Sequence, residues 1–89
     1  MNSLKTIRIE ENDAENGVLR VVCSDGSRRV LRIQKVLQDE HIPLGMRETW
    51  RCMWEAGDFG KADLYGDDIV WDGWCEVLAE DIDDYLEII

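Results

Sequence analysis

The ten residues from Tyr65 to Trp74, Tyr-Gly-Asp-Asp-Ile-Val-Trp-Asp-Gly-Trp, constrain the fold of this chain more than any other stretch. A turn signal at Gly66-Asp67 is followed by a short β-favouring run, Ile69-Val70-Trp71, and by a second turn signal at Asp72-Gly73. Because side chains alternate between the two faces of a strand, Ile69 and Trp71 point to the same side. We therefore expect Ile69 and Trp71 to anchor the core.

The strongest hairpin signal lies in the N-terminal half of the chain. The β-type runs Val18 to Cys23 and Ser27 to Ile33 are separated by Ser24-Asp25-Gly26, which is typical of a tight turn. In the first run, Leu19 and Val21 share one face with Cys23. This face is expected to point into the core.

A first strand is expected ahead of this hairpin. Leu4 to Glu10 alternates between apolar and polar residues, with Ile7 and Ile9 on one face. The next segment, Glu11 to Gly17, is polar and turn-forming, so we expect a loop there. An edge strand at Ile7 to Ile9 is able to pair with its copy in a second chain, so the sequence leaves a homodimer open.

Two helical segments are expected in the middle of the chain. Val36 and Leu37 have the spacing of a single turn, and Pro43 stops any helix before it. A longer helix is expected over Arg47 to Ala56, because Trp50, Met53 and Trp54 fall at positions i, i+3 and i+4. Gly57 is well placed to cap its C-terminus.

The last third of the chain predicts a second hairpin and a helix. Phe59 to Leu64 is expected to form a strand that turns at Gly66-Asp67 into Ile69 to Trp71. Apolar residues recur at helical spacing from Leu78 to Ile89, which predicts an amphipathic C-terminal helix. Residues 1–89 thus predict one α+β domain: a small bent antiparallel sheet of two hairpins, a short middle helix and the C-terminal helix.

Acidic residues are concentrated in the C-terminal part of the chain. Residues 1–54 carry nine Lys/Arg and eight Asp/Glu, whereas residues 55–89 carry Lys61 and twelve acids, so the net charge changes from +1 to −11. Such a segment either keeps a small protein in solution or forms a docking face for a basic partner. The candidate partner-binding residues are the acids of the second hairpin and of the expected C-terminal helix: Asp67, Asp68, Asp72, Glu80, Asp81, Asp83, Asp84 and Glu87.

An Ile-x-Trp motif at Ile69 and Trp71 follows the Asp25-Gly26 hairpin and a helix that carries Trp50 and Trp54, and Ile82 lies in the acidic tail. Over about residues 18–86, this order of elements resembles the bacterial domain of unknown function family 2442. The family usually has Trp-Pro where this chain has Trp71-Asp72, and Trp74-Cys75 looks like an addition. The resemblance implies a small α+β domain with no established enzymatic activity, frequent genetic pairing with another small protein, and an antitoxin-like role.

The sequence offers little support for catalysis or for metal binding. Cys23, Cys52 and Cys75 are far apart and include no Cys-x-x-Cys pair, so neither a disulfide framework nor a zinc site is expected. Cys52 shows no sign of activation by His41, the only histidine. The acids lack the order of an EF-hand. We expect a non-enzymatic protein without a cofactor.

Two classes of function fit these features. The first is a small acidic protein-binding module that docks on and inhibits a basic or nucleic-acid-binding protein, as an antitoxin or a phage-encoded defence inhibitor such as an anti-CRISPR does. The alternative is a regulatory accessory domain that senses a small ligand or works with a DNA-binding transcription regulator. Direct nucleic-acid binding is disfavoured, because phosphate affinity needs clustered Lys/Arg. The sequence lacks a secretory signal and a membrane-spanning apolar run, which predicts a cytoplasmic protein.

Overall fold

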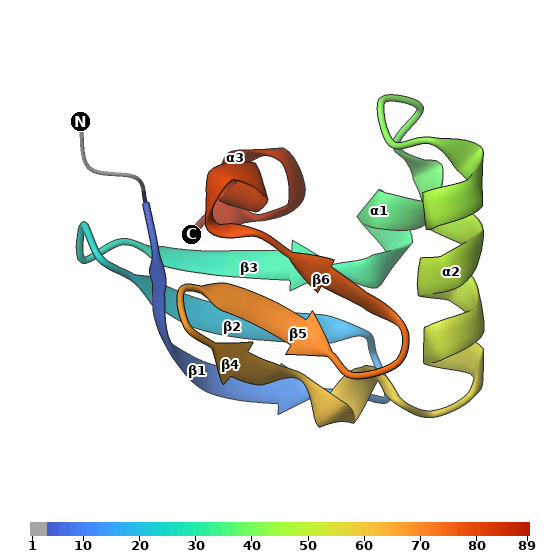
Figure 1. The fold of residues 1–89 in the computed structure, drawn as a ribbon, viewed down its shortest axis with the longest axis horizontal. Helices are drawn as coiled ribbons and strands as arrows, with labels where there is room; N and C mark the ends of the chain where they lie inside the picture. The colour runs from blue at the N-terminus through green and yellow to red at the C-terminus, as the bar shows by residue number, and fades with distance from the viewer. Residues whose placement is uncertain (1–3) are drawn as a thin grey trace.

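Two antiparallel sheets face each other in the computed structural model, which describes residues 4–89 (Figure 1). The larger sheet has the strand order β1-β2-β3-β7 and the smaller has the order β4-β5-β6. The strands are β1 (Thr6–Asp13), β2 (Val18–Cys23), β3 (Arg28–Arg32), β4 (Asp63–Tyr65), β5 (Asp68–Trp71), β6 (Cys75–Val77) and β7 (Glu87–Ile88). The helices are α1 (Ile33–Gln38), α2 (Leu44–Glu55) and α3 (Ile82–Tyr85), with 3-10 turns η1 (Phe59–Lys61) and η2 (Ala79–Asp81). The α+β class expected from the sequence is confirmed.

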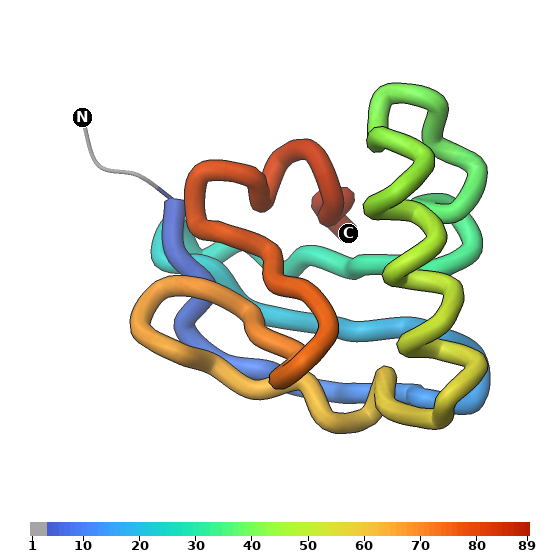
Figure 2. Tube along the Cα trace, turned by 45° about the vertical axis from the view of Figure 1, so that its right-hand side comes forward, coloured from blue at the N-terminus to red at the C-terminus, as the bar shows by residue number. Residues whose placement is uncertain are grey.

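The core lies between the two sheets and includes Trp50 and Met53 of α2. Figure 2 shows α2 at one end of the sheets. The inward residues Leu19 and Val21 of β2 are fully buried, as the alternation predicted. Ile69 and Trp71 of β5 are buried opposite them. The two predicted hairpins are therefore real, but they belong to two sheets that sandwich the core and not to one bent sheet.

A chain of aromatic rings crosses this core. Trp71 packs edge-on against Trp50 of α2 with ring centroids 4.9 Å apart, and against Phe59 of η1 at 5.8 Å. Trp50 in turn lies 5.7 Å from the ring of Tyr85 on α3. The Trp71 indole N–H also donates a hydrogen bond to the Phe59 carbonyl at 2.8 Å. Trp71 thus connects α2, η1 and the smaller sheet.

Strand β1 is an edge strand with two irregularities. Its pairing with β2 shifts between Thr6 and Arg8, and again between Ile9 and Glu11. The first shift turns Ile7 towards solvent, while Thr6 is buried and Ile9 is half-buried. The expectation that Ile7 and Ile9 share a face is wrong, because a bulge inverts the alternation. Pairing with β2 also extends the strand to Asp13, so the expected loop is confined to the turn before Val18.

Helix α2 begins at Leu44, three residues before the expected start. Pro43 occupies the N-cap position with a φ of −53° and ψ of 143°, so the proline precedes the helix as expected. At the other end Gly57 adopts a φ of +80°, and the Asp58 N–H donates to the Met53 carbonyl at 3.1 Å. The predicted glycine cap is confirmed.

The C-terminal segment is not the continuous helix expected from its apolar stripe. After η2 and the single turn of α3, the chain extends and β7 pairs with β3 through Arg29↔Ile88 and Val30↔Glu87. Ile82 and Leu86 are buried as the stripe requires, but Ile89 is exposed. The open edge of β3 supplies backbone partners for β7, which explains why the helix ends.

The segment before the second hairpin also differs from expectation. Phe59–Lys61 forms the turn η1, and only Asp63–Tyr65 form a strand. Beyond the hairpin, Cys75–Val77 adds a third strand, β6, which pairs with β5. Trp74-Cys75, read from the sequence as an addition, leads into that strand.

Candidate protein-binding face

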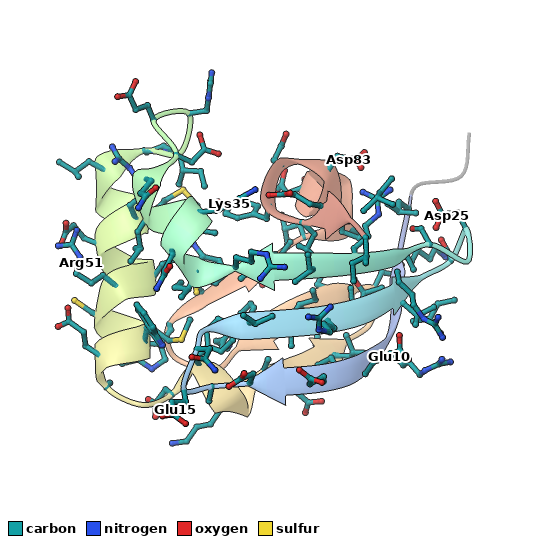
Figure 3. All side chains as sticks on the ribbon, turned by 180° about the vertical axis from the view of Figure 1, so that it is seen from behind. Glu10, Glu15, Asp25, Lys35, Arg51 and Asp83 are labelled. Atoms are coloured by element: carbon teal, nitrogen blue, oxygen red, sulfur yellow. The ribbon has the colours of Figure 1, made fainter. Side chains whose placement is uncertain are left out.

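Two of the candidate acids in the C-terminal segment are held by ion pairs within the protein. Asp83 on α3 contacts the guanidinium of Arg29, whose side chain is only 7% exposed, and Glu87 of β7 pairs with Lys35 of α1 (Figure 3). Arg29 also donates to the Ser27 hydroxyl at 3.2 Å. A buried guanidinium is costly without a carboxylate. Asp83 therefore fastens the C-terminal segment to β3 of the larger sheet, and Glu87 fastens it to α1.

Replacing Asp83 with asparagine should lower the free energy of unfolding by about 1–3 kcal/mol, because the buried Arg29 loses its closest carboxylate. The neighbouring Asp84→Asn variant is the matched control, since Asp84 is exposed and has no ion pair among residues 4–89; its effect should stay within about 0.5 kcal/mol. Urea denaturation followed by circular dichroism measures both variants. Equal stability of the two would contradict a fastening role for Asp83.

The three candidate acids of the second hairpin lie at the two ends of β5. Asp67 lies 3.8 Å from the Lys5 ammonium. Asp68 accepts a hydrogen bond from the Ala79 backbone N–H at 2.8 Å, so it shapes the start of η2. Asp72 is exposed beyond the other end of β5, about 13 Å from Asp68 along the strand. Strand β5 therefore separates Asp72 from Asp67 and Asp68.

The remaining candidates, Glu80, Asp81 and Asp84, form no ion pair within residues 4–89. Asp81 and Asp84 border a cleft of about 540 Å³ between α3 and the connection from α1 to α2. The other residues that line this cleft are Asp39, His41, Ile42, Pro43, Met46, Asp83 and Tyr85. A smaller hollow of about 290 Å³ adjoins it and shares Asp39, Ile42, Asp83, Asp84 and Tyr85 with it.

The cleft carries negative charge at neutral pH. The backbone N–H of His41 donates to Asp39 at 2.9 Å and lowers the pKa of that carboxyl. Burial raises the pKa of the Tyr85 phenol, and the charge of Asp81 raises it further. The tyrosine therefore stays neutral beside ionised carboxylates, and the cleft presents an aromatic ring with an acidic rim.

A second hollow, of about 230 Å³, lies on the other side of Met46, between α2 and the turn from β5 to β6. Its lining residues are Met46, Thr49, Trp50, Trp74, Cys75 and Glu76. Met46 is 44% exposed and lines both the cleft and this hollow. We refer to the joined surface, formed by Asp39, Met46, Trp74, Glu76, Asp81, Asp84 and Tyr85, as the Met46 face.

Sequence reasoning missed five members of this face, namely Asp39, Met46, Trp74, Glu76 and Tyr85. Four of them come from the α1–α2 connection, from α2 and from the start of β6, and only the fold brings them beside α3, which carries Tyr85. A local signal existed for Trp74, because a tryptophan after Asp72-Gly73 follows a turn and lies close to the surface.

The cysteines and the histidine do not combine into a catalytic or metal site. Burial raises the pKa of the Cys75 thiol to about 12 and also raises the pKa of Cys23, so both are poor nucleophiles. Cys52 is exposed on α2, about 12 Å along the helix from its start at Leu44, and His41 precedes that start. Within residues 4–89 no three His, Cys, Asp or Glu side chains are grouped to hold a metal ion.

Comparisons with known proteins leave the function open. No protein-family model, no curated protein and no solved structure matches the chain. The resemblance to the domain of unknown function family 2442 therefore remains a prediction. None of the helices in residues 4–89 combines the length and the apolar character that crossing a bilayer requires.

Proposed function

We propose that this protein is a non-enzymatic binding module that docks on a basic protein through the Met46 face and thereby inhibits it. The observation that supports this most is the distribution of unpaired charge. Most of the Lys and Arg side chains in residues 4–89 are engaged by the protein's own carboxylates. Glu76, Asp81 and Asp84, in contrast, lack a cationic partner in that range and border exposed apolar groups.

This combination is typical of a protein interface. Methionine and aromatic side chains are enriched at interface cores, and polar groups form the rim. Met46 and Trp74 would supply apolar contact area, while the surrounding carboxylates would accelerate the encounter with a basic surface. A partner whose basic surface binds nucleic acid would lose that surface when it is covered. This is the action expected of an antitoxin or of a phage-encoded defence inhibitor such as an anti-CRISPR in the cytoplasm.

The alternative, a regulatory accessory domain that senses a small ligand, draws on one observation. The cleft of about 540 Å³ beside α3 falls within the range of small-molecule sites, about 300–1,000 Å³. Its acidic rim would select a cationic ligand. This alternative would be favoured if the protein bound a small organic cation in the cleft but captured no basic protein.

Capture from a lysate of the native host tests the proposal. The triple variant Glu80→Gln/Asp81→Asn/Asp84→Asn removes the unpaired acids of η2 and α3 and leaves Asp83 on Arg29. A matched control, Glu15→Gln/Glu55→Gln/Asp63→Asn, removes three exposed acids outside the Met46 face. A basic protein captured by the parent and by the control, but not by the triple variant, is the expected result. Equal capture by all three baits would reject docking through this face.

A further inference from the structure

We infer that the hollow beside Trp74 receives an arginine side chain of the basic partner. This inference rests on the proposed function and adds the residue type that anchors the partner. The occupant is chosen by charge complementarity, because an aromatic wall and an unpaired carboxylate meet in the same hollow.

The aromatic wall is held in place before any partner arrives. The Trp74 indole N–H donates to Asp58 at 2.8 Å, and the Trp74 backbone N–H donates to the Trp71 carbonyl at 2.9 Å. Gly73 adopts a φ of +82°, which permits the tight turn before Trp74. Trp74 remains 36% exposed. A fixed and partly exposed indole offers a binding surface at a small cost in conformational entropy.

The floor of the hollow is equally rigid. Trp50 is buried between the rings of Trp71 and Tyr85, and it also lines the hollow. Met46 and Thr49 stand on the same helix one to four residues before it and form the side wall. An aliphatic stem is therefore able to cover apolar surface while its charged end stays near solvent.

The carboxylate of Glu76 decides the charge of the occupant. Glu76 is exposed on β6, lines the hollow and has no cationic partner within residues 4–89. A neutral apolar side chain in the hollow would displace water from the Glu76 carboxylate without replacing the hydrogen bonds that the water donates. A guanidinium stacks on an indole face and donates two parallel hydrogen bonds to a carboxylate, whereas an ammonium is more compact and more strongly hydrated. Arginine therefore fits this hollow better than lysine.

The position of the hollow relates the anchor to the rest of the Met46 face. Met46 separates the hollow from the cleft beside α3 and contacts both. An arginine seated on Trp74 would place neighbouring residues of the partner over Met46, towards Asp81 and Asp84. The hollow thus fixes the position of the partner on the Met46 face, and the α3 acids attract the partner from a distance.

A capped tripeptide, acetyl-Gly-Arg-Gly-amide, is the probe for this inference. Titration into the ¹⁵N-labelled protein should shift the Trp74 indole signal and the Thr49 and Glu76 amide signals in a saturable manner, with a dissociation constant on the order of 1 mM. Replacing arginine by citrulline, which is neutral and nearly isosteric, should weaken binding about tenfold or more. The lysine peptide should bind more weakly than the arginine peptide.

Protein variants supply the second arm of the experiment. Glu76→Gln changes an exposed residue and should weaken the arginine peptide about fivefold or more. Tyr65→Ala, which removes an exposed aromatic outside this hollow, should leave binding unchanged. Equal binding of the citrulline peptide, or an unchanged affinity in Glu76→Gln, would overturn the inference.

The two proposals fail in different ways. If the α3 amides respond to the arginine peptide and the Trp74 indole does not, the anchor hollow is rejected and the acidic docking face is retained. If the hollow binds the arginine peptide but the triple α3 variant still captures the parent's partner, the docking proposal is rejected.

Discussion

Trp71→Ala should lower the free energy of unfolding by about 3–5 kcal/mol, a large fraction of the total stability of a small domain. Trp71 is 1% exposed, and its ring contacts those of Trp50 and Phe59. Its removal leaves a cavity where three elements meet. The Phe59 carbonyl would lose the indole hydrogen bond and keep the one from the Asn12 side-chain amide, at 3.0 Å. Thermal and urea unfolding followed by circular dichroism measure the loss.

Two further variants separate the contribution of the aromatic ring at position 71 from that of its hydrogen bond and from a general effect of removing an aromatic side chain. Trp71→Phe keeps an aromatic ring and loses the indole hydrogen bond, so its cost should lie between those of the parent and Trp71→Ala. Tyr65→Ala removes an exposed aromatic side chain and should change stability by no more than about 0.5 kcal/mol. If the melting temperature of Trp71→Ala were close to that of the parent, the prediction that Trp71 anchors the core would be wrong.

Gly17→Ala should destabilise the protein by about 2–5 kcal/mol, because it combines backbone strain with overpacking. Gly17 has a φ of +66°, and a Cβ atom there would lie 2.0 Å from Cγ2 of the buried Ile33. The Gly17 carbonyl also accepts the Ile33 N–H at 2.9 Å, so the β1–β2 turn cannot move away freely from the start of α1.

Gly26→Ala is the matched control for this prediction. Gly26 has a φ of +83°, but no atom lies within 4 Å of the position that a Cβ would take. Its replacement by alanine should lower the free energy of unfolding only through the strain of a positive φ in a residue with a Cβ atom, by about 1–2 kcal/mol. Melting temperatures of both variants give the comparison. If Gly17→Ala proved no less stable than Gly26→Ala, the contact with Ile33 would not be tight.

Local patterns predicted the strands whose partners are close in sequence. The alternation of Leu19 and Val21, and of Ile69 and Trp71, identified the two hairpins and their buried faces. The strands β6 and β7 escaped prediction because they are three and two residues long and depend on edges supplied by other segments. Some apolar residues from Leu78 to Ile89 fit both the spacing of a helix and the alternation of a strand. The open edge of β3, with which β7 pairs, determines that the end of this segment forms a strand.

Charge in the sequence does not reveal what each carboxylate contacts. Asp83 and Asp84 are neighbours with the same side chain, yet Asp83 contacts Arg29, which lies 54 positions earlier, and Asp84 forms no ion pair within residues 4–89. The division of the acids into ion-paired and unpaired groups therefore required the fold. The same holds for Trp74 and Glu76, which flank α2 only after the smaller sheet has formed.

We propose that the unpaired acids of η2 and α3 attract a basic protein partner. The decisive measurement is the association rate of a captured partner with the parent and with the triple variant Glu80→Gln/Asp81→Asn/Asp84→Asn, at low and at high salt. The rate for the parent should fall about tenfold or more between low and high salt, since the screening length shortens from about 30 Å at 0.01 M to about 3 Å at 1 M. The triple variant should associate more slowly than the parent at low salt and approach it at high salt, with unchanged stability. If the parent and the triple variant associate equally fast at both salt concentrations, these acids are only a solvated surface and the proposed function is wrong.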